Sequence, residues 1–205
     1  MKTLLLDIGN VLMGFDFNRA RDRYLPKSPG QTDPIQALEP LRHRFEMGEI
    51  GPDHFVSKGM ECLDFQGTAQ EFQNIWEEIF TPIPSMWNLI HQARHSYRLF
   101  LLSNTNEIHR SYLFRCFPAF ADFQGGVYSD RAGALKPDPA IFKRAIDELS
   151  LVATETLFVD DLPENVRAAA SLGFKAVCYK AHKHPEFLEL ARTNGFPLPD
   201  TSRLA

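Results

Sequence analysis

Short apolar runs alternate with helical patterns along most of this chain. Each run is four to six residues long, and the runs cover 3–6, 98–103, 126–129, 156–159 and 175–179. A strand that is buried on both faces has such a continuous apolar run, and parallel strands need a helical crossover between them. The alternation therefore predicts an α/β fold with a doubly wound, Rossmann-like parallel sheet covered by helices on both faces.

The segment from residue 15 to residue 83 interrupts this alternation. It contains helical patterns and no clear strand, so we interpret it as a small helical-bundle cap inserted after the first strand. Residues 1–14 and 84–205 then form the core. The links at 13–17 and 80–85 are expected to serve as the hinge of this cap.

Several residues of the cap predict where its helices begin. Asp33-Pro34 combines an N-cap with a proline at the first helical position, and Thr68 with Glu71 forms a capping box. Pro40 is expected to interrupt the helix that begins at Pro34, because proline has no backbone N–H to donate.

The charge pattern favours a small-molecule partner. The net charge is -4 and the 22 Lys and Arg residues are scattered, which predicts no nucleic-acid partner. No apolar run approaches the length of a membrane span and no signal-peptide pattern is visible, so we expect no membrane partner and a cytoplasmic location. Cys62, Cys116 and Cys178 lack metal-ligand spacing and are interpreted as buried apolar residues. The oligomeric state is not indicated.

Polar side chains stand where three of the predicted strands end, and a lysine lies in a further connection. In chain order these residues are Asp7, Ser103, Asn104, Lys136, Asp160 and Asp161. The carboxyl ends of parallel strands share one edge of the sheet, where ligands bind in such folds. Adjacent carboxylates repel unless a cation is present, and a small set of oxygen ligands suggests Mg2+. The hydroxyl, amide and ammonium groups suit phosphate oxygens. Each residue alone is better explained as a helix cap or a surface lysine, but their order at successive strand ends reverses that judgement and favours a site.

Four short motifs, in this order, resemble those of the haloacid dehalogenase-like hydrolase superfamily. They are Leu6-Asp7-Ile8-Gly9-Asn10-Val11, Leu102-Ser103-Asn104, Lys136-Pro137-Asp138-Pro139 and Val159-Asp160-Asp161. The resemblance covers nearly the whole chain. The helical insertion is similar to the small cap of the subgroup that includes bacterial sugar phosphatases and the 2-haloacid dehalogenases.

The resemblance implies a Mg2+-dependent phosphatase that acts on a small phosphorylated metabolite, with a sugar phosphate favoured. Asp7 would be the nucleophile and form an aspartyl phosphate. The resemblance places Mg2+ on Asp7, the Gly9 carbonyl and Asp161, with Asp160 in or next to the coordination shell. Lys136 would act in catalysis by neutralising charge. The phosphate-binding residues would be Ser103, Asn104 and Lys136.

Gly9 departs from the family pattern. Most phosphatases of the family carry there a second Asp that protonates the leaving group, and losing a general acid costs a factor of about 10^2 to 10^4 in rate. The substrate could have a good leaving group, a cap residue or water could replace the acid, or turnover could be poor. Candidate cap residues are Asp16, His43 and Glu46.

Other functions stay open at this point. A 2-haloacid dehalogenase also lacks the second Asp but has no use for Mg2+, so the pair Asp160-Asp161 disfavours it. A phosphonatase would need a cap lysine, for which Lys58 is a candidate. A non-catalytic phosphate-binding protein would keep the same phosphate-binding residues and lose turnover.

Overall fold

The computed structural model describes residues 1–24 and 33–199. Its centre is a five-stranded parallel sheet in the order β5-β4-β1-β6-β7. These strands are β1 (Thr3–Leu6), β4 (Arg98–Ser103), β5 (Gly126–Tyr128), β6 (Thr156–Asp160) and β7 (Lys175–Cys178). The predicted α/β fold with a doubly wound parallel sheet is confirmed.

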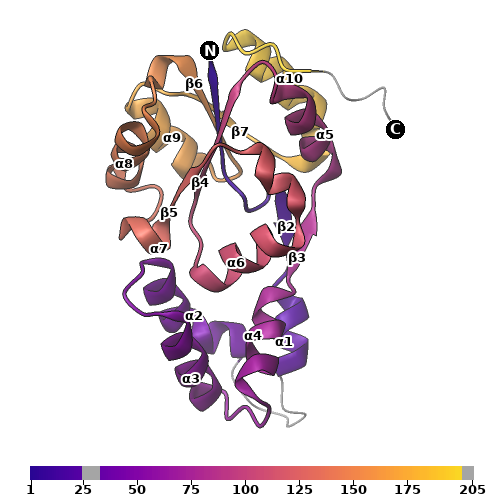
Figure 1. The fold of residues 1–205 in the computed structure, drawn as a ribbon, viewed down its shortest axis with the longest axis vertical. Coiled ribbons are helices and arrows are strands. Elements are labelled where there is room, and N and C mark those ends of the chain that lie inside the picture. The colour runs from indigo at the N-terminus through magenta and orange to yellow at the C-terminus, as the bar shows by residue number, and fades with distance from the viewer. Residues whose placement is uncertain (25–32, 200–205) are drawn as a thin grey trace.

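Strand β1 lies in the middle of the sheet, and helices cover both of its faces. Leu4 faces an apolar cluster with α5 (Pro84–Ala93), α6 (Glu107–Cys116) and α10 (His184–Thr193), whereas Leu5 faces a second cluster with α8 (Pro139–Leu149) and α9 (Pro163–Ser171). Figure 1 shows α8 and α9 on one side of the sheet and α5 and α10 on the other. Because its neighbours are apolar on both sides, the continuous apolar run of β1 is what its position requires.

Four helices between β1 and β4 pack around an apolar cluster of their own. They are α1 (Asn18–Tyr24), α2 (Pro34–Glu46), α3 (Pro52–Cys62) and α4 (Ala69–Glu77). They form the lower part of the molecule in Figure 1. The predicted caps are present, since Asp33 accepts from the Ile35 amide and Thr68 and Glu71 form the capping box. We refer to these four helices as the cap.

Helix α2 runs through Pro40, so the expected interruption is wrong. A proline removes only one backbone hydrogen bond, and Pro40 is exposed. Leu38 before it and Phe45 after it are both buried in the cap cluster, which holds the two halves of the helix in line.

Two short strands connect the cap to the core. Strand β2 (Met13–Phe15) pairs antiparallel with β3 (Phe80–Pro82), and the register places Phe15 opposite Phe80. We expected links without strand structure here. Three residues are too few to show the alternation that identifies a strand in a sequence, and the pairing itself is non-local. The two crossings between core and cap are therefore one paired ribbon.

The core helix α6 also reaches into the cap. Ile108 is 3% exposed and belongs to the apolar cluster of the cap. The next residue, His109, donates from Nε2 to the Trp76 carbonyl across 3.0 Å, and its ring stacks on the Trp76 indole. Arg115 at the other end of α6 pairs with Glu77 at 2.8 Å.

The cysteines differ from expectation. Cys62 and Cys116 are exposed and Cys178 is half-buried, because the helix faces that carry the first two point away from the apolar clusters. Across residues 1–24 and 33–199, no helix combines the length and the apolar character needed to cross a bilayer.

Candidate active site

Asp7 follows β1 directly and is buried. Its amide donates to the Val159 carbonyl, which extends the ladder with β6 by one residue, and its Oδ1 accepts from the Ile8 amide across 2.7 Å. Burial raises the pKa of Asp7 to about 6, although Lys136 opposes this rise and Asp160 adds to it. A carboxylate in such a position is costly unless a partner balances its charge.

Lys136 is the partner that balances this charge. Its ammonium contacts three acceptors: Asp7 Oδ1 at 2.9 Å, Asp160 Oδ2 at 2.7 Å and the Leu102 carbonyl at 2.9 Å. An ammonium has three donors, so each is engaged and the position of Nζ is fixed. Burial works to lower the pKa of Lys136, but the charges of Asp7 and Asp160 outweigh it and raise the pKa, so the group stays cationic.

The side chain of Asn104 holds the backbone of Lys136. Its Oδ1 accepts from the Lys136 amide at 2.8 Å, and its Nδ2 donates to the Lys136 carbonyl at 2.9 Å. This pairing uses both ends of the carboxamide, so the side chain of Asn104 fixes the backbone of Lys136. Ser103 is buried, and its hydroxyl acts to lower the pKa of Asp7.

Asp160 and Asp161 differ in what their oxygens contact. Asp160 is fully buried, and its carboxylate accepts from Lys136, from the Leu162 amide at 2.8 Å and from Asn165 Nδ2 at 3.0 Å. Asp161 is half-buried and accepts from Asn10 Nδ2 at 3.0 Å. Burial raises the pKa of Asp161 and the Asn10 contact opposes the rise. Asp160 thus orients Lys136, while Asp161 keeps oxygen capacity toward the cavity.

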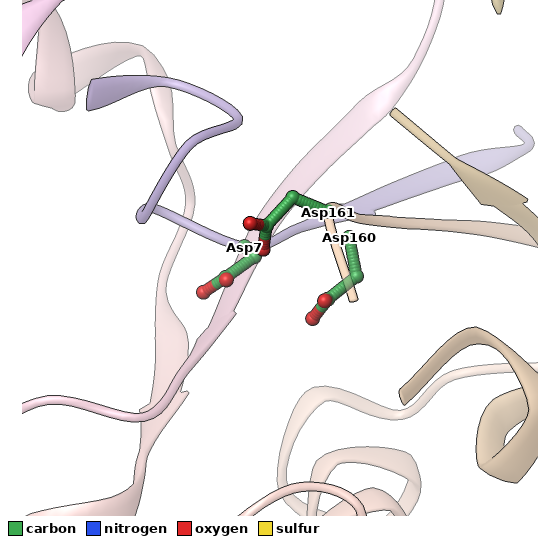
Figure 2. Close-up of side chains that lie close together, drawn as sticks. All are labelled: Asp7, Asp160 and Asp161. Carbon is green, nitrogen blue, oxygen red and sulfur yellow. The ribbon is translucent and has the colours of Figure 1, made fainter. Parts of the chain in front are cut away.

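The carboxylates of Asp7, Asp160 and Asp161 lie close together. One oxygen of each lies within 4.8 Å of the others. In Figure 2 the Asp161 side chain turns toward Asp7, whereas the Asp160 side chain leaves the backbone in another direction. The structure therefore brings together the acidic residues that the sequence placed at separate strand ends.

The site opens into a cavity of about 370 Å³ between the core and the cap. The core supplies Asp7, Ser103, Lys136 and Asp161 to its lining, and helix α2 of the cap adds polar side chains, which are Arg42, His43 and Glu46. The volume is in the range that holds a small metabolite.

Two cap residues considered from the sequence lie elsewhere. The carboxylate of Asp16 accepts from the Asn18 amide at 2.9 Å and so caps α1. Lys58 on α3 pairs with Glu61 at 2.6 Å. Neither residue belongs to the lining of the cavity, so the lysine that a phosphonatase would need is not placed there by Lys58.

Three residues of the site were missed by sequence reasoning. Asn10 adopts a positive φ of 52°, and its side chain contacts Asp161. Asn165 lies on the first turn of α9 and faces Asp160, a contact that its spacing of five residues from Asp160 could have suggested. Phe15 covers Gly9, and no sequence signal predicts that contact.

The ring of Phe15 occupies the space beside Gly9. A Cβ built on Gly9 would lie 3.0 Å from Cε1 of Phe15 and 3.9 Å from Oδ2 of Asp7. A side chain at position 9 would therefore project toward the nucleophile candidate, and the ring of Phe15 lies in its path.

A parallel α/β sheet with a helical cap over acidic strand ends defines a capped hydrolase. A family model of haloacid dehalogenase-like hydrolases matches residues 1–173. The chain therefore belongs to the haloacid dehalogenase-like hydrolases, as its four motifs predicted.

Individual relatives in this family are phosphatases or bind magnesium. The chain is 28% identical over 189 residues to the D-ribitol-5-phosphate phosphatase of Bacteroides thetaiotaomicron, which covers 85% of this chain and 90% of that protein. A family enzyme of the same organism, solved as a magnesium complex, is similar with a TM-score of 0.80 at 26% identity, covering 92% of this chain and 98% of that one. A structure of that enzyme with magnesium and inorganic phosphate has a TM-score of 0.78 at 26% identity and covers 89% and 96%.

Proposed function

We propose that this chain is a Mg2+-dependent phosphatase that hydrolyses a small phosphorylated metabolite in the cytoplasm. A sugar or sugar-alcohol phosphate is the favoured substrate class, since the similar Bacteroides enzyme is a D-ribitol-5-phosphate phosphatase. Residues 1–14 and 84–205 form the catalytic core in this proposal, and residues 15–83 form the cap. The observation that carries it is the ammonium of Lys136 between Asp7 and Asp160, with Asp161 facing the same cavity.

The donor set fits Mg2+. Asp7, Gly9 and Asp161 all line the cavity, and the resemblance to the family would use their carboxylate and carbonyl oxygens, which are the kind of ligand that Mg2+ prefers. Oδ1 of Asn165 is buried there and has no hydrogen-bond partner among the described residues. Asp160 would act next to the metal by holding Lys136, because its own oxygens already accept protein donors. When bound, Mg2+ would neutralise charge on the phosphoryl oxygens.

The protein groups then divide the chemistry between them. One carboxylate oxygen of Asp7 attacks phosphorus, and the bond from phosphorus to the leaving oxygen breaks as the aspartyl phosphate forms. Lys136 stays protonated and reduces the repulsion between the anionic nucleophile and the anionic substrate. The Ser103 hydroxyl and the Asn104 backbone N–H hold the phosphoryl oxygens. Water then attacks phosphorus and releases inorganic phosphate and free Asp7.

Phosphate release from a panel of sugar phosphates, sugar-alcohol phosphates and p-nitrophenyl phosphate tests the proposal. We expect turnover with Mg2+, loss with chelator, and a loss of at least about 10^3-fold in Asp7→Asn, because the nucleophile is removed. Asp147→Asn is the matched control, since Asp147 is exposed on α8 outside the cavity.

Two further assays on the same protein, chloride release and phosphate binding, separate the alternatives. Chloride release from a 2-chloroacid without added metal would support a dehalogenase instead. Binding of phosphate and Mg2+ without hydrolysis of any ester would support a phosphate-binding protein. Full activity in a clean Asp7→Asn preparation would remove the nucleophile assignment.

A further inference from the structure

The proposed phosphatase still needs a proton for its leaving group. Position 9, where the family acid stands, is a glycine, and the ring of Phe15 lies 3.0 Å from the Cβ that a side chain there would have. Alkoxide ions leave slowly without a proton, so hydrolysis of an alkyl phosphate requires an acid from another part of the cavity. This inference rests on the proposed function and concerns the source of that proton.

Most ionisable groups of the cavity are already engaged. Asp7 and Asp161 serve as nucleophile and metal ligand in the proposal, and the three donors of Lys136 are used. His109 donates from Nε2 to the Trp76 carbonyl and accepts at Nδ1 from Asn106 at 3.2 Å. Since both ring nitrogens are occupied in a buried pocket, His109 has no proton to exchange with a substrate. The groups that remain are those of helix α2.

Glu46 is the member of α2 that is both fixed and able to exchange a proton. Arg42 holds one of its oxygens, Oε1, at 2.8 Å, and the side chain of Glu46 is 13% exposed. Its other oxygen, Oε2, accepts no hydrogen bond from any residue of 1–24 and 33–199. Arg42 itself is always protonated and cannot act as an acid at neutral pH.

Two further features set Glu46 apart from its neighbours. His43 also lines the cavity, but it is exposed, so its ring is not held in one orientation. The guanidinium of Arg42 is held in turn by Glu39 at 2.6 Å and lies over the Phe17 ring, with 5.9 Å from Cζ to the ring centroid. Burial raises the pKa of Glu46, against the opposing effect of Arg42, so a protonated fraction persists closer to neutral pH than for an exposed Glu.

We propose that Glu46 of the cap is the general acid and base of this enzyme, in place of the missing aspartate at position 9. Its carboxyl gives a proton to the leaving oxygen while that oxygen separates from phosphorus and Asp7 bonds to phosphorus. Its carboxylate then accepts a proton from the water that attacks phosphorus and breaks the bond to Asp7. The net reaction consumes one water and yields the alcohol and phosphate.

The test compares Glu46→Gln with Glu39→Gln on two esters. Both glutamates contact Arg42, but Glu46 lines the cavity and Glu39 does not. The esters are the best sugar or sugar-alcohol phosphate of the panel and p-nitrophenyl phosphate, whose leaving group needs little proton help. For Glu46→Gln we expect kcat/KM to fall by about 10^2-fold on the alkyl ester and by less than about threefold on the aryl ester.

A second readout reports the base step. In Glu46→Gln, p-nitrophenol should appear as a rapid burst equal to the enzyme concentration. The aspartyl phosphate forms at the normal rate in this variant, but its hydrolysis is slow because no base accepts the proton of the attacking water. Glu39→Gln should retain both activities within about threefold and show no new burst, whereas His43→Gln should change the two activities to the same extent.

Several outcomes would overturn the proposal. Equal losses on the two esters would assign Glu46 a structural role, and an unchanged alkyl rate would remove it from the chemistry. A selective loss in His43→Gln instead would move the role to His43. If the wild-type protein hydrolyses neither ester, the proposed phosphatase function itself fails, and this result differs from each of the others.

Discussion

Gly48 of the cap lies directly against the backbone of Asp130 in the core. A Cβ built on Gly48 would be 2.0 Å from the Asp130 carbonyl oxygen, and Gly48 has a φ of +71°. Asp130 belongs to the short helix α7 (Ser129–Ala132), which follows β5. No side chain fits at this contact, so the turn after α2 can pack against the core only with a glycine at position 48. Because Glu46 precedes this turn, the same contact fixes its position relative to the core.

Gly48→Ala should therefore destabilise the protein by more than backbone strain alone. Gly133→Ala is the matched control, because Gly133 also has a positive φ of +63° but its Cβ would meet no atom within 4 Å. We expect the control to lower the free energy of unfolding by about 1 to 2 kcal/mol and Gly48→Ala to lower it by about 1 to 3 kcal/mol more. Urea unfolding measures both, and equal losses would show that the turn moves without cost.

An aspartate introduced at position 9 should act as the general acid only when the ring of Phe15 is also removed. We expect Gly9→Asp alone to change alkyl phosphate hydrolysis by less than about threefold, because Phe15 lies in the path of the new side chain. In Gly9→Asp with Phe15→Ala, kcat/KM on the alkyl ester should exceed that of Phe15→Ala by about tenfold or more. Initial rates with both esters check this, and a full gain in Gly9→Asp alone would show that Phe15 does not block the position.

Lys136→Met should destabilise the fold as well as abolish activity. The variant leaves the buried carboxylates of Asp7 and Asp160 without their shared cation, which costs about 3 to 5 kcal/mol at pH 7. Without Lys136 the pKa of Asp7 should rise above about 6, so the folded variant binds protons more tightly than its unfolded chain. The deficit relative to wild type should therefore shrink as the pH falls from 7 toward about 6, and it should level off below that pH because Asp7 of wild type is then protonated as well.

Urea unfolding of Lys136→Met at pH 7 and pH 5, beside wild type, measures this change. Lys143→Met is the control, because Lys143 is exposed on α8, and it should shift the free energy of unfolding by less than about 0.5 kcal/mol at either pH. A deficit in Lys136→Met that is the same at both pH values would contradict the charge argument.

His109 should make stability depend on pH at the junction of core and cap. Burial lowers the pKa of His109 to about 3, although the bond to the Trp76 carbonyl opposes this effect. Between about pH 6.5 and pH 3 the unfolded chain, with a His pKa near 6.5, binds a proton at this residue that the folded protein does not bind. Stability from this group is fully present above about pH 6.5 and is lost as the pH falls from there toward 3.

The matched measurement compares wild type with His109→Gln, whose amide can still donate to the Trp76 carbonyl. One titrating group contributes at most about 1.4 kcal/mol per pH unit, and the slope of wild type between pH 6 and pH 4 should exceed that of the variant by nearly this amount. Identical slopes would mean that His109 is protonated in the folded protein.

The sequence alone predicted the parallel sheet and the acidic strand ends because both depend on local patterns. The apolar run before Asp7 defines a strand buried on both faces, and parallel strands bring their carboxyl ends to one edge. The contacts that the sequence did not predict depend on the directions in which individual side chains point. Nothing near Phe15 in the chain shows that its ring covers Gly9, and Asp16 and Glu46 looked equivalent until one proved to cap α1 and the other to line the cavity.

Ile108 and His109 join α6 to the cap, so separating α6 from the cap has a free-energy cost. An opening that draws α6 away from the cap exposes Ile108 and breaks the bond between His109 and the Trp76 carbonyl. Exposing such a side chain costs about 1.5 to 3 kcal/mol and losing the bond about 0.5 to 1.5 kcal/mol. A conformation that lacks both is then populated by roughly one molecule in 30 to one in 2,000, and a substrate that binds only to it has its apparent affinity reduced by that fraction.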